Sequence, residues 1–145
     1  GDQQGLIFID TLDQTAPRLD NLGVVRLQDP YFEGMAVVQG HILLAPSGSG
    51  QSIKVLSPLS DQGTTIARMP VQLSGVHVNG VLHASGDITI AGRVRVYGAV
   101  AAGGTITSAS SGSTLEVWYD HDLSRGFYRG LPVVYRAPGT WMTRY

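Results

Sequence analysis

Few residues in this sequence have the type and spacing that chemistry needs. His77 and His83 are six positions apart, and Gly80 lies between them. Two histidines do not complete a zinc site, and the glycine predicts a bend between the two rings. We therefore expect both imidazoles to face water and to hold no metal.

Acidic residues gather in two places. Asp10, Asp13 and Asp20 follow a short apolar run, and residues 119–122 read Tyr-Asp-His-Asp. Neither group has the glycine-bounded spacing of a calcium loop. Because aspartate commonly anchors turns, we expect turns here rather than cation sites.

The motifs of common enzymes are missing from the sequence. It contains no P-loop, no GxGxxG, no HExxH and no GxSxG. Cysteine is also absent, which removes disulfides, thiol catalysis and cysteine-based zinc sites. The sequence therefore predicts that the protein is not an enzyme and has no catalytic residues, metal or cofactor.

Arginine and aromatic residues offer a surface for recognition. The formal net charge is −1, so no field of the whole molecule attracts polyanions. Seven of the 11 aromatic residues lie between Leu115 and Tyr145. Exposed aromatic and arginine side chains dominate binding hot spots. The predicted recognition surface consists of Arg93, Arg95, Trp118, Tyr119, Arg125, Tyr128 and Arg129. Arg93 and Arg95 could contact a polyanion or could simply lend solubility.

An internal repeat must position these residues. The stretch from Val76 to Ile106 overlays on itself when it is shifted by 18 residues, with glycine on glycine and apolar on apolar residues. The apolar members recur at every second residue, the period of a β-strand. Because one copy cannot close a core, neighbouring copies must stack. We expect an all-β protein, a single-stranded β-solenoid with coils of about 18 residues and an aromatic C-terminal cap. An antiparallel meander with glycine turns is the alternative.

The same alternation separates an inward set from an outward set. His77, Asn79, His83, Ser85, Asp87 and Thr89 are expected to point outward. The predicted core consists of Val76, Val78, Leu82, Ala84, Ile88, Val94, Val96, Val100, Ala102 and Ile106.

Composition and pattern predict one domain in three parts. Residues 1–33 are expected to form an irregular lead-in that covers the first coil, residues 34–114 the β-solenoid coils, and residues 115–145 the capping strands. A cap is expected because the end of such a stack exposes an unpaired strand edge and apolar side chains.

Two short motifs near the C-terminus resemble a known family. Residues 118–123 read WYDHDL and the sequence ends in APGTWMTRY, after a glycine-punctuated β repeat. From about Leu73 onward this resembles the C-terminal part of PilX-like minor pilins of type IV pili. In that family Tyr-Asp-Pro-x-Leu follows the repeats and Gly-x-Trp lies close to the end. The matching residues are Tyr119, Asp120, Leu123, Gly139 and Trp141, and His121 stands where proline is usual.

The resemblance implies a non-enzymatic, surface-presenting pilus subunit that aids assembly, adhesion or DNA uptake. Its partners would be other pilin subunits and a surface glycan or DNA. The implied location is the cell surface, after export across the inner membrane. No run of about 18 apolar residues is present, so this part of the protein is expected not to contact a membrane. Because the chain begins at Gly1 without a Met, we expect the natural N-terminus to lie upstream, and the resemblance implies a membrane helix there in the full protein.

Two other functions compete with the pilin interpretation. A bactofilin-like cytoskeletal β-solenoid polymerises end to end and keeps its ends open, whereas the aromatic tail predicts a covered end. A carbohydrate-binding adhesin or phage protein would place aromatic side chains on an outer face for sugar stacking.

Overall fold

Every regular element in the described part of the chain is a β-strand. The computed structural model describes residues 5–11, 21–61, 64–120, 127–128 and 131–132. The strands are β1 (Gly5–Asp10), β2 (Val24–Leu27), β3 (Phe32–Gln39), β4 (His41–Leu44), β5 (Gln51–Asp61), β6 (Thr64–Val76), β7 (Val78–Ala84), β8 (Ile88–Ile90), β9 (Arg93–Ala102), β10 (Ile106–Ser108), β11 (Thr114–Tyr119), β12 (Phe127–Tyr128) and β13 (Leu131–Pro132).

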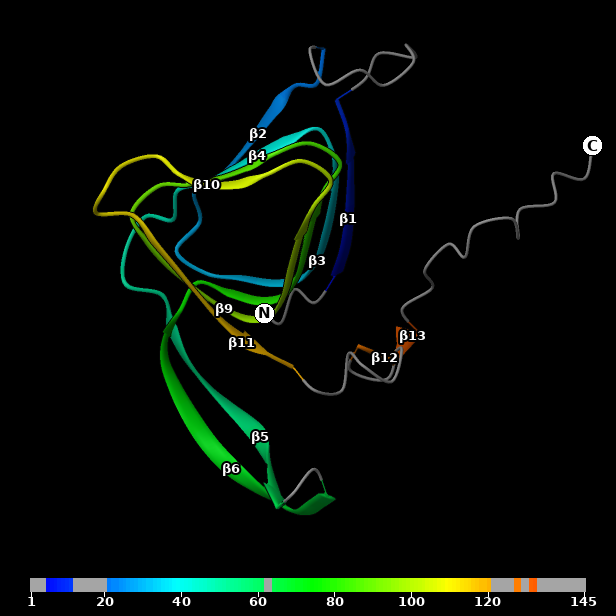
Figure 1. Cartoon of the computed structure of the whole chain (residues 1–145), viewed down its shortest axis with the longest axis vertical. Coiled ribbons are helices and arrows are strands. Elements are labelled where there is room, and N and C mark those ends of the chain that lie inside the picture. Colours follow the sequence, from blue (N-terminus) through cyan, green and yellow to red (C-terminus); the bar gives the residue numbers. More distant parts are fainter. Residues whose placement is uncertain (1–4, 12–20, 62–63, 121–126, 129–130, 133–145) are drawn as a thin grey trace, which may run out of the picture.

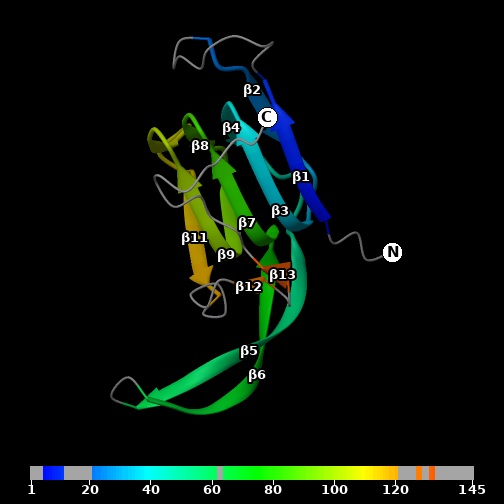
Figure 2. The same ribbon diagram turned by 90° about the vertical axis from the view of Figure 1, so that its right-hand side faces the viewer.

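Two parallel sheets enclose the core. The larger sheet has five strands in the order β1-β3-β7-β9-β11, and the smaller has four in the order β10-β8-β4-β2. Both sheets surround one interior in Figure 1, and Figure 2 shows the strands of the larger sheet side by side. The chain reaches β4, β8 and β10 of the smaller sheet directly after β3, β7 and β9 of the larger one.

A long antiparallel hairpin, here called the arm, extends away from the two sheets. It consists of β5 and β6, which pair from Gln51↔Val76 at the base to Asp61↔Thr64 near the tip. Figures 1 and 2 show it as a twisted two-stranded ribbon that leaves the body at one corner. Leu56 and Met69 are more than half exposed.

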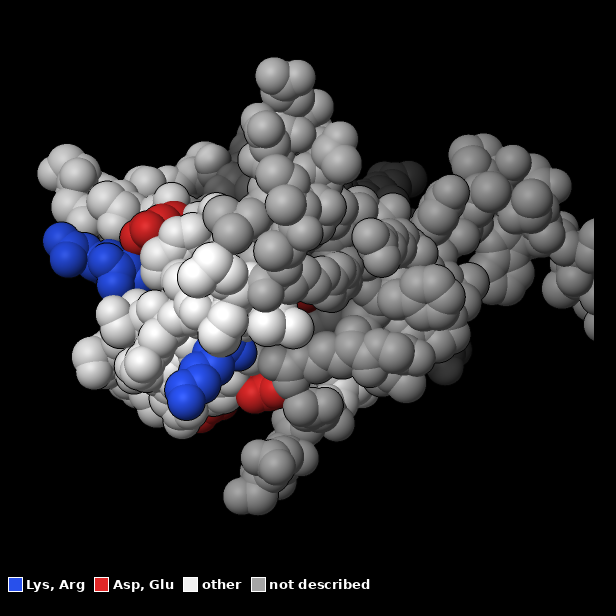
Figure 3. Space-filling model, turned by 90° about the horizontal axis from the view of Figure 1, so that it is seen from below, with Lys and Arg blue, Asp and Glu red and all other residues white. Residues whose placement is uncertain are grey.

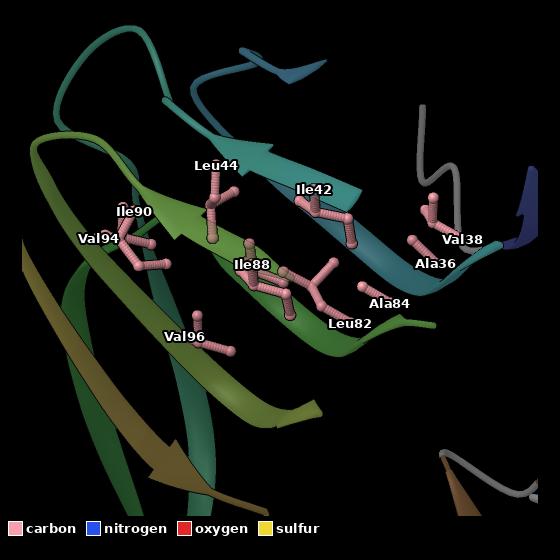
Figure 4. Close-up of a cluster of buried hydrophobic side chains, with 11 residues drawn as sticks. Ala36, Val38, Ile42, Leu44, Leu82, Ala84, Ile88, Ile90, Val94 and Val96 are labelled. Atoms are coloured by element: carbon pink, nitrogen blue, oxygen red, sulfur yellow. The ribbon is translucent and has the colours of Figure 1, made fainter. Parts of the chain in front are cut away.

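Alternating apolar residues from both sheets form the core. Side chains at every second position of a strand point to one face, and here that face meets the opposite sheet. The buried cluster consists of Ala36, Val38, Ile42, Leu44, Val78, Leu82, Ala84, Ile88, Ile90, Val94 and Val96 (Figure 4). Burial of each large member stabilises the fold by roughly 1.5–3 kcal/mol.

Glycines stand in register where the strands of the larger sheet bend. Gly34, Gly80 and Gly98 are direct partners across β3, β7 and β9. Gly34 has φ 139° and Gly98 has φ 136°, in the region that L side chains rarely adopt. A Cβ atom on Gly98 would overlap the carbonyl oxygen of Gly80. The close approach of the backbones therefore requires glycine here.

The prediction of a β-solenoid with regular 18-residue coils is wrong. The strands form two parallel and two antiparallel sheets. An 18-residue offset joins only β7 to β9 and β8 to β10. Other parallel neighbours are offset by 29 residues (β1 and β3), 17 (β2 and β4), 46 (β3 and β7, β4 and β8) and 21 (β9 and β11). The offset of 46 arises because the arm lies between these strands in the chain.

The two ends of the chain also differ from expectation. In the stretch predicted as an irregular lead-in, β1 and β2 form the outermost strands of the two sheets. In the stretch predicted as a cap, β11 pairs in parallel with β9 and extends the larger sheet. Farther on, β12 and β13 pair with each other. The part of the tail described as β11 is thus a fifth strand of the sheet and not a cap.

The predicted core residues differ in how far they are buried. Seven of them, from Val76 to Val96, are buried. Val100 and Ala102 are partly buried against the cluster. Ile106 is 45% exposed because β10 is the outermost strand of its sheet.

Candidate binding surface at the base of the arm

The outer face of β9 and β11 brings several predicted recognition residues together. Val94 and Val96 point into the core, so the alternating residues Arg93, Arg95 and Tyr97 point outward. On β11, Leu115 packs against the core, which turns Glu116 and Trp118 outward. The strands pair Arg95 with Glu116 and Tyr97 with Trp118.

Arg95 connects β9, β11 and the arm. Its Nε donates a hydrogen bond of 2.9 Å to Oε2 of Glu116, and its Nη1 donates one of 3.0 Å to the Ser74 carbonyl oxygen. Its Cζ lies 5.7 Å from the centre of the Trp118 ring, close enough for a cation–π attraction. These contacts hold the guanidinium in one position, which a flexible ammonium would not achieve.

His77 is buried, although the sequence predicted it to face water. Its Nδ1 accepts a hydrogen bond of 3.1 Å from the Arg95 N–H. Its Nε2 lies 3.2 Å from the Gly48 carbonyl oxygen, which can only accept, so the ring hydrogen is on Nε2. The loop at the arm's base covers the ring, and repeat spacing alone does not predict this cover. Both nitrogens serve structure, and neither is left to bind a metal.

Asn79 is also buried where the sequence predicted exposure. Its Nδ2 donates a hydrogen bond of 3.0 Å to the hydroxyl of Tyr31, which in turn donates one of 2.7 Å to Oε2 of Glu33. Glu33, Asn79 and Tyr97 are neighbours in register across β3, β7 and β9. A row of polar and aromatic side chains therefore continues across the sheet to Trp118.

A cleft opens between the arm's base and β9. It has a volume of about 270 Å³. Its lining residues are Gly48, Ser49, Gly75, His77, Arg93 and Arg95. Arg93 is exposed, and its guanidinium takes part in none of the hydrogen bonds or ion pairs found among the described residues. A positive group therefore faces the cleft without a carboxylate of the described chain beside it.

The predicted recognition surface is thus assembled in part. Arg93, Arg95 and Trp118 lie together on the outer face, whereas Tyr119 alternates to the other side of β11. Tyr128 belongs to β12, and Arg125 and Arg129 lie outside the described residues.

Sequence reasoning missed four members of this surface. They are Tyr31, Glu33, Asn79 and Tyr97. The 18-residue repeat places Asn79 beside Tyr97, so that pair was open to prediction. The position of Tyr31 and Glu33 depends on an offset of 46 residues that the repeat does not contain.

The predicted outward residues on the other strands have structural roles. His83 is exposed, while Ser85, Asp87 and Thr89 are half-buried. The Thr105 N–H and hydroxyl donate hydrogen bonds of 2.8 and 2.9 Å to Oδ1 of Asp87. These bonds, and to a smaller extent the nearby His41, lower the pKa of Asp87 below its ordinary value of 3.8.

No metal centre or membrane helix is found in the described part of the chain. No group of three or more His, Cys, Asp or Glu residues there could hold a metal ion. No helix in the same residues is long and apolar enough to cross a membrane. Asp13, Asp20, His121 and Asp122 lie outside the described residues.

Large apolar side chains remain exposed on the outermost strands. On β1 and β2 they are Leu6, Ile7, Phe8 and Val24, and on β10 and β11 they are Ile106, Val117 and Tyr119. Leu6 is 70% exposed and Phe8 62%. Strand edges with exposed apolar side chains favour pairing with another chain.

Comparison with known proteins gives no relative for this chain. No protein-family model, no curated protein and no solved structure matches it. The function is therefore inferred from the geometry and from the two C-terminal motifs.

Proposed function

We propose that the chain is a non-enzymatic, surface-presenting subunit of a larger assembly, a minor pilin of a type IV pilus. The observation that carries the assembly role is the exposed apolar surface of the outermost strands. A protein that works alone rarely leaves large apolar side chains together at a sheet edge. The pilus itself is suggested by the C-terminal motifs that resemble those of PilX-like minor pilins.

The strand edges supply two kinds of contact for neighbouring subunits. β1 offers unpaired backbone groups on one side, since its only partner in the described sheet is β3. Leu6 and Phe8 project on the outer face, at positions that pair with Met35 and Val37. A pilin neighbour would bury these side chains and gain roughly 25 cal/mol for each Å² of apolar surface removed from water.

As a minor pilin, the chain would have other pilin subunits as its partners and would act at the cell surface after export. The roles to be tested are pilus assembly, adhesion and DNA uptake. Neither a turnover reaction nor a cofactor is part of the proposal.

Deletion of the gene tests the proposal. We expect the deletion to reduce the number of pili, attachment to surfaces or uptake of DNA, and the wild-type gene to restore the lost property. Restoration with Phe8→Asp should fail, because a charge at the edge opposes burial against a neighbour. His83→Asp is the matched control, since His83 is exposed on an inner strand of the same sheet. A deletion strain normal in all three properties would refute the proposal.

A cytoskeletal polymer of the bactofilin type is the second candidate. It is favoured by the parallel order of both sheets, in which β1 and β11 are the opposite outermost strands of one sheet. An edge of one copy could therefore pair in parallel with the opposite edge of the next. Filaments of the purified protein in electron micrographs, together with a cytoplasmic location, would favour this candidate over the pilin.

A further inference from the structure

We propose that the outer face beside the base of the arm binds an oligosaccharide that carries a carboxylate, with the carboxylate at Arg93 and the sugar rings along Tyr97 and Trp118. This inference rests on the proposed role in presenting a surface and names the ligand of that surface. Four features of the described residues support it: a free cation, an aromatic pair, a row of hydrogen-bonding groups and a balanced charge.

Arg93 is the group that would recognise the carboxylate. Its guanidinium lines the cleft of about 270 Å³ and has no partner among the described residues. Guanidinium groups match carboxylates with two parallel hydrogen bonds. Arg95 lines the same cleft, but Glu116 and the Ser74 carbonyl already hold it. Arg95 therefore acts as a positioning residue that shapes the wall, while Arg93 is available to the ligand.

Tyr97 and Trp118 supply an aromatic surface next to this cation. They are direct neighbours in register on the outer face, and each is half-buried. The face of an aromatic ring is the negative part of its quadrupole, and the C–H groups on one face of a sugar ring carry partial positive charge. Arg95 lies over one face of the Trp118 ring, so a sugar would stack on the opposite face of Trp118 and on Tyr97. Arg93 and Tyr97 are four residues apart on one strand, a separation of about 13 Å along β9. A chain of sugar units can span that distance, whereas one carboxylate cannot.

Polar groups continue the surface beyond the aromatic pair. Glu33 and Asn79 lie in the same row across the sheet, tied together through the Tyr31 hydroxyl. Asn79 is buried and holds the Tyr31 hydroxyl in place, so it does not reach a ligand itself. The half-buried carboxylate of Glu33 and phenol of Tyr31 are the polar groups at this end of the surface, where a sugar hydroxyl group would lie.

The charge of the surface favours a saccharide over a nucleic acid. Two arginines, Arg93 and Arg95, are balanced by two glutamates, Glu33 and Glu116. In Figure 3 the described surface seen from below is mostly uncharged, and red atoms lie near the blue ones. Nucleic-acid sites need an excess of positive charge to neutralise several phosphates. An oligosaccharide with an isolated carboxylate needs only the one free guanidinium.

Calorimetric titration of the purified 145-residue chain tests the inference. The probes are 3′-sialyllactose, which carries one carboxylate, neutral lactose, acetate and a single-stranded oligothymidylate. We expect 3′-sialyllactose to bind the wild type more tightly than the other three. Arg93→Gln should weaken this binding about tenfold, the effect of losing one charge-assisted contact. Trp118→Ala should also weaken it, and Lys54→Gln on the exposed arm is the control that should bind like the wild type.

Three outcomes would overturn the inference. The first is equal binding of 3′-sialyllactose by Arg93→Gln and the wild type. The second is an equal loss of binding in Arg93→Gln and Lys54→Gln, and the third is binding of lactose, acetate or oligothymidylate at least as tight as that of 3′-sialyllactose. Circular dichroism of each variant shows whether it is folded, and Arg93→Gln should keep the wild-type spectrum because Arg93 has no described structural partner. The titration uses no pili, so its result is separate from the result of the gene deletion.

Discussion

A series of three glycine-to-alanine substitutions tests how closely the strands of the larger sheet approach each other. Gly98 has φ 136°, and a Cβ there would overlap the Gly80 carbonyl oxygen. Gly92 has φ 83°, but a Cβ there would meet nothing within 4 Å. A Cβ on Gly112 would also meet nothing within 4 Å, and the φ of Gly112 lies outside the left-handed region. The series therefore separates backbone strain from steric overlap.

Backbone strain and steric overlap determine the expected losses of unfolding free energy. Gly112→Ala should change it by less than about 1 kcal/mol, because alanine mainly restricts the unfolded chain. Gly92→Ala should lose about 1–2 kcal/mol, the cost of a left-handed conformation for a residue with a Cβ. Gly98→Ala adds an overlap with the backbone that only a shift of β7 or β9 can relieve. Its loss should be about 4 kcal/mol or more.

Urea unfolding followed by circular dichroism measures the three losses. With a slope of about 1–3 kcal/mol per M, Gly92→Ala should lower the midpoint by roughly 1 M and Gly98→Ala by at least twice as much. Failure of Gly98→Ala to fold would also be an expected result, because it corresponds to a loss at least as large. A variant Gly98→Ala as stable as Gly112→Ala would refute the close approach of the strands.

The remaining predictions concern the core, one carboxylate and the arm. Val96→Asp should lose about 3–5 kcal/mol of unfolding free energy, because it places a charge at a fully buried position. Thermal unfolding measures this loss, and a loss below about 1 kcal/mol would contradict the assignment of Val96 to the core. Hydrogen bonds from Thr105 lower the pKa of Asp87 in the folded protein below the ordinary value of 3.8. The stability that Asp87 contributes is therefore present above pH 3.8 and is lost as the pH falls through this lowered pKa. Asp87→Asn should therefore be less stable than the wild type at pH 7 and should approach it in acid, as pH-dependent urea unfolding would show; an equal difference at all pH values would contradict this. Arg95→Ala should increase hydrogen exchange at the arm's base, near Ser74, more than in the centre of the core, and unchanged exchange there would show that Arg95 does not hold the arm.

The 18-residue repeat correctly predicted the pairing of β7 with β9, between which no long hairpin is inserted. The 18-residue offset is the actual register between β7 and β9, and the alternation placed Val78 and Val96 in the core. This succeeded because strand period and cross-strand register are both encoded in local spacing.

The same repeat could not predict where the chain leaves the sheets. The arm lies between β4 and β7, and its length sets the offset of 46 residues that joins Phe32 to Val78. Nothing in a short local pattern fixes such a long-range pairing. The burial of His77 and Asn79 follows from this pairing and from the loop at Gly48, so both were wrongly predicted to face water.

The residues of the candidate surface could be predicted from the sequence only in part. Arg93, Arg95 and Trp118 stood out by residue type, and the structure places them on one face. Tyr31 lies just before β3 and Glu33 lies in it, far away in the sequence, and only the folded chain shows that they continue this face. The tail that the sequence predicted as a cap contributes β11, because its alternating apolar residues pair with β9.

The content of sheared pili tests the assembly role most directly. Pili are sheared from cells that produce the wild type, Phe8→Asp or His83→Asp, and the amount of the chain in the pilus fraction is measured relative to whole cells. We expect the wild type and His83→Asp in this fraction, and we expect Phe8→Asp to be depleted from it while its amount in whole cells stays the same. Absence of the wild type from the pilus fraction, or equal incorporation of Phe8→Asp, would contradict the assembly role.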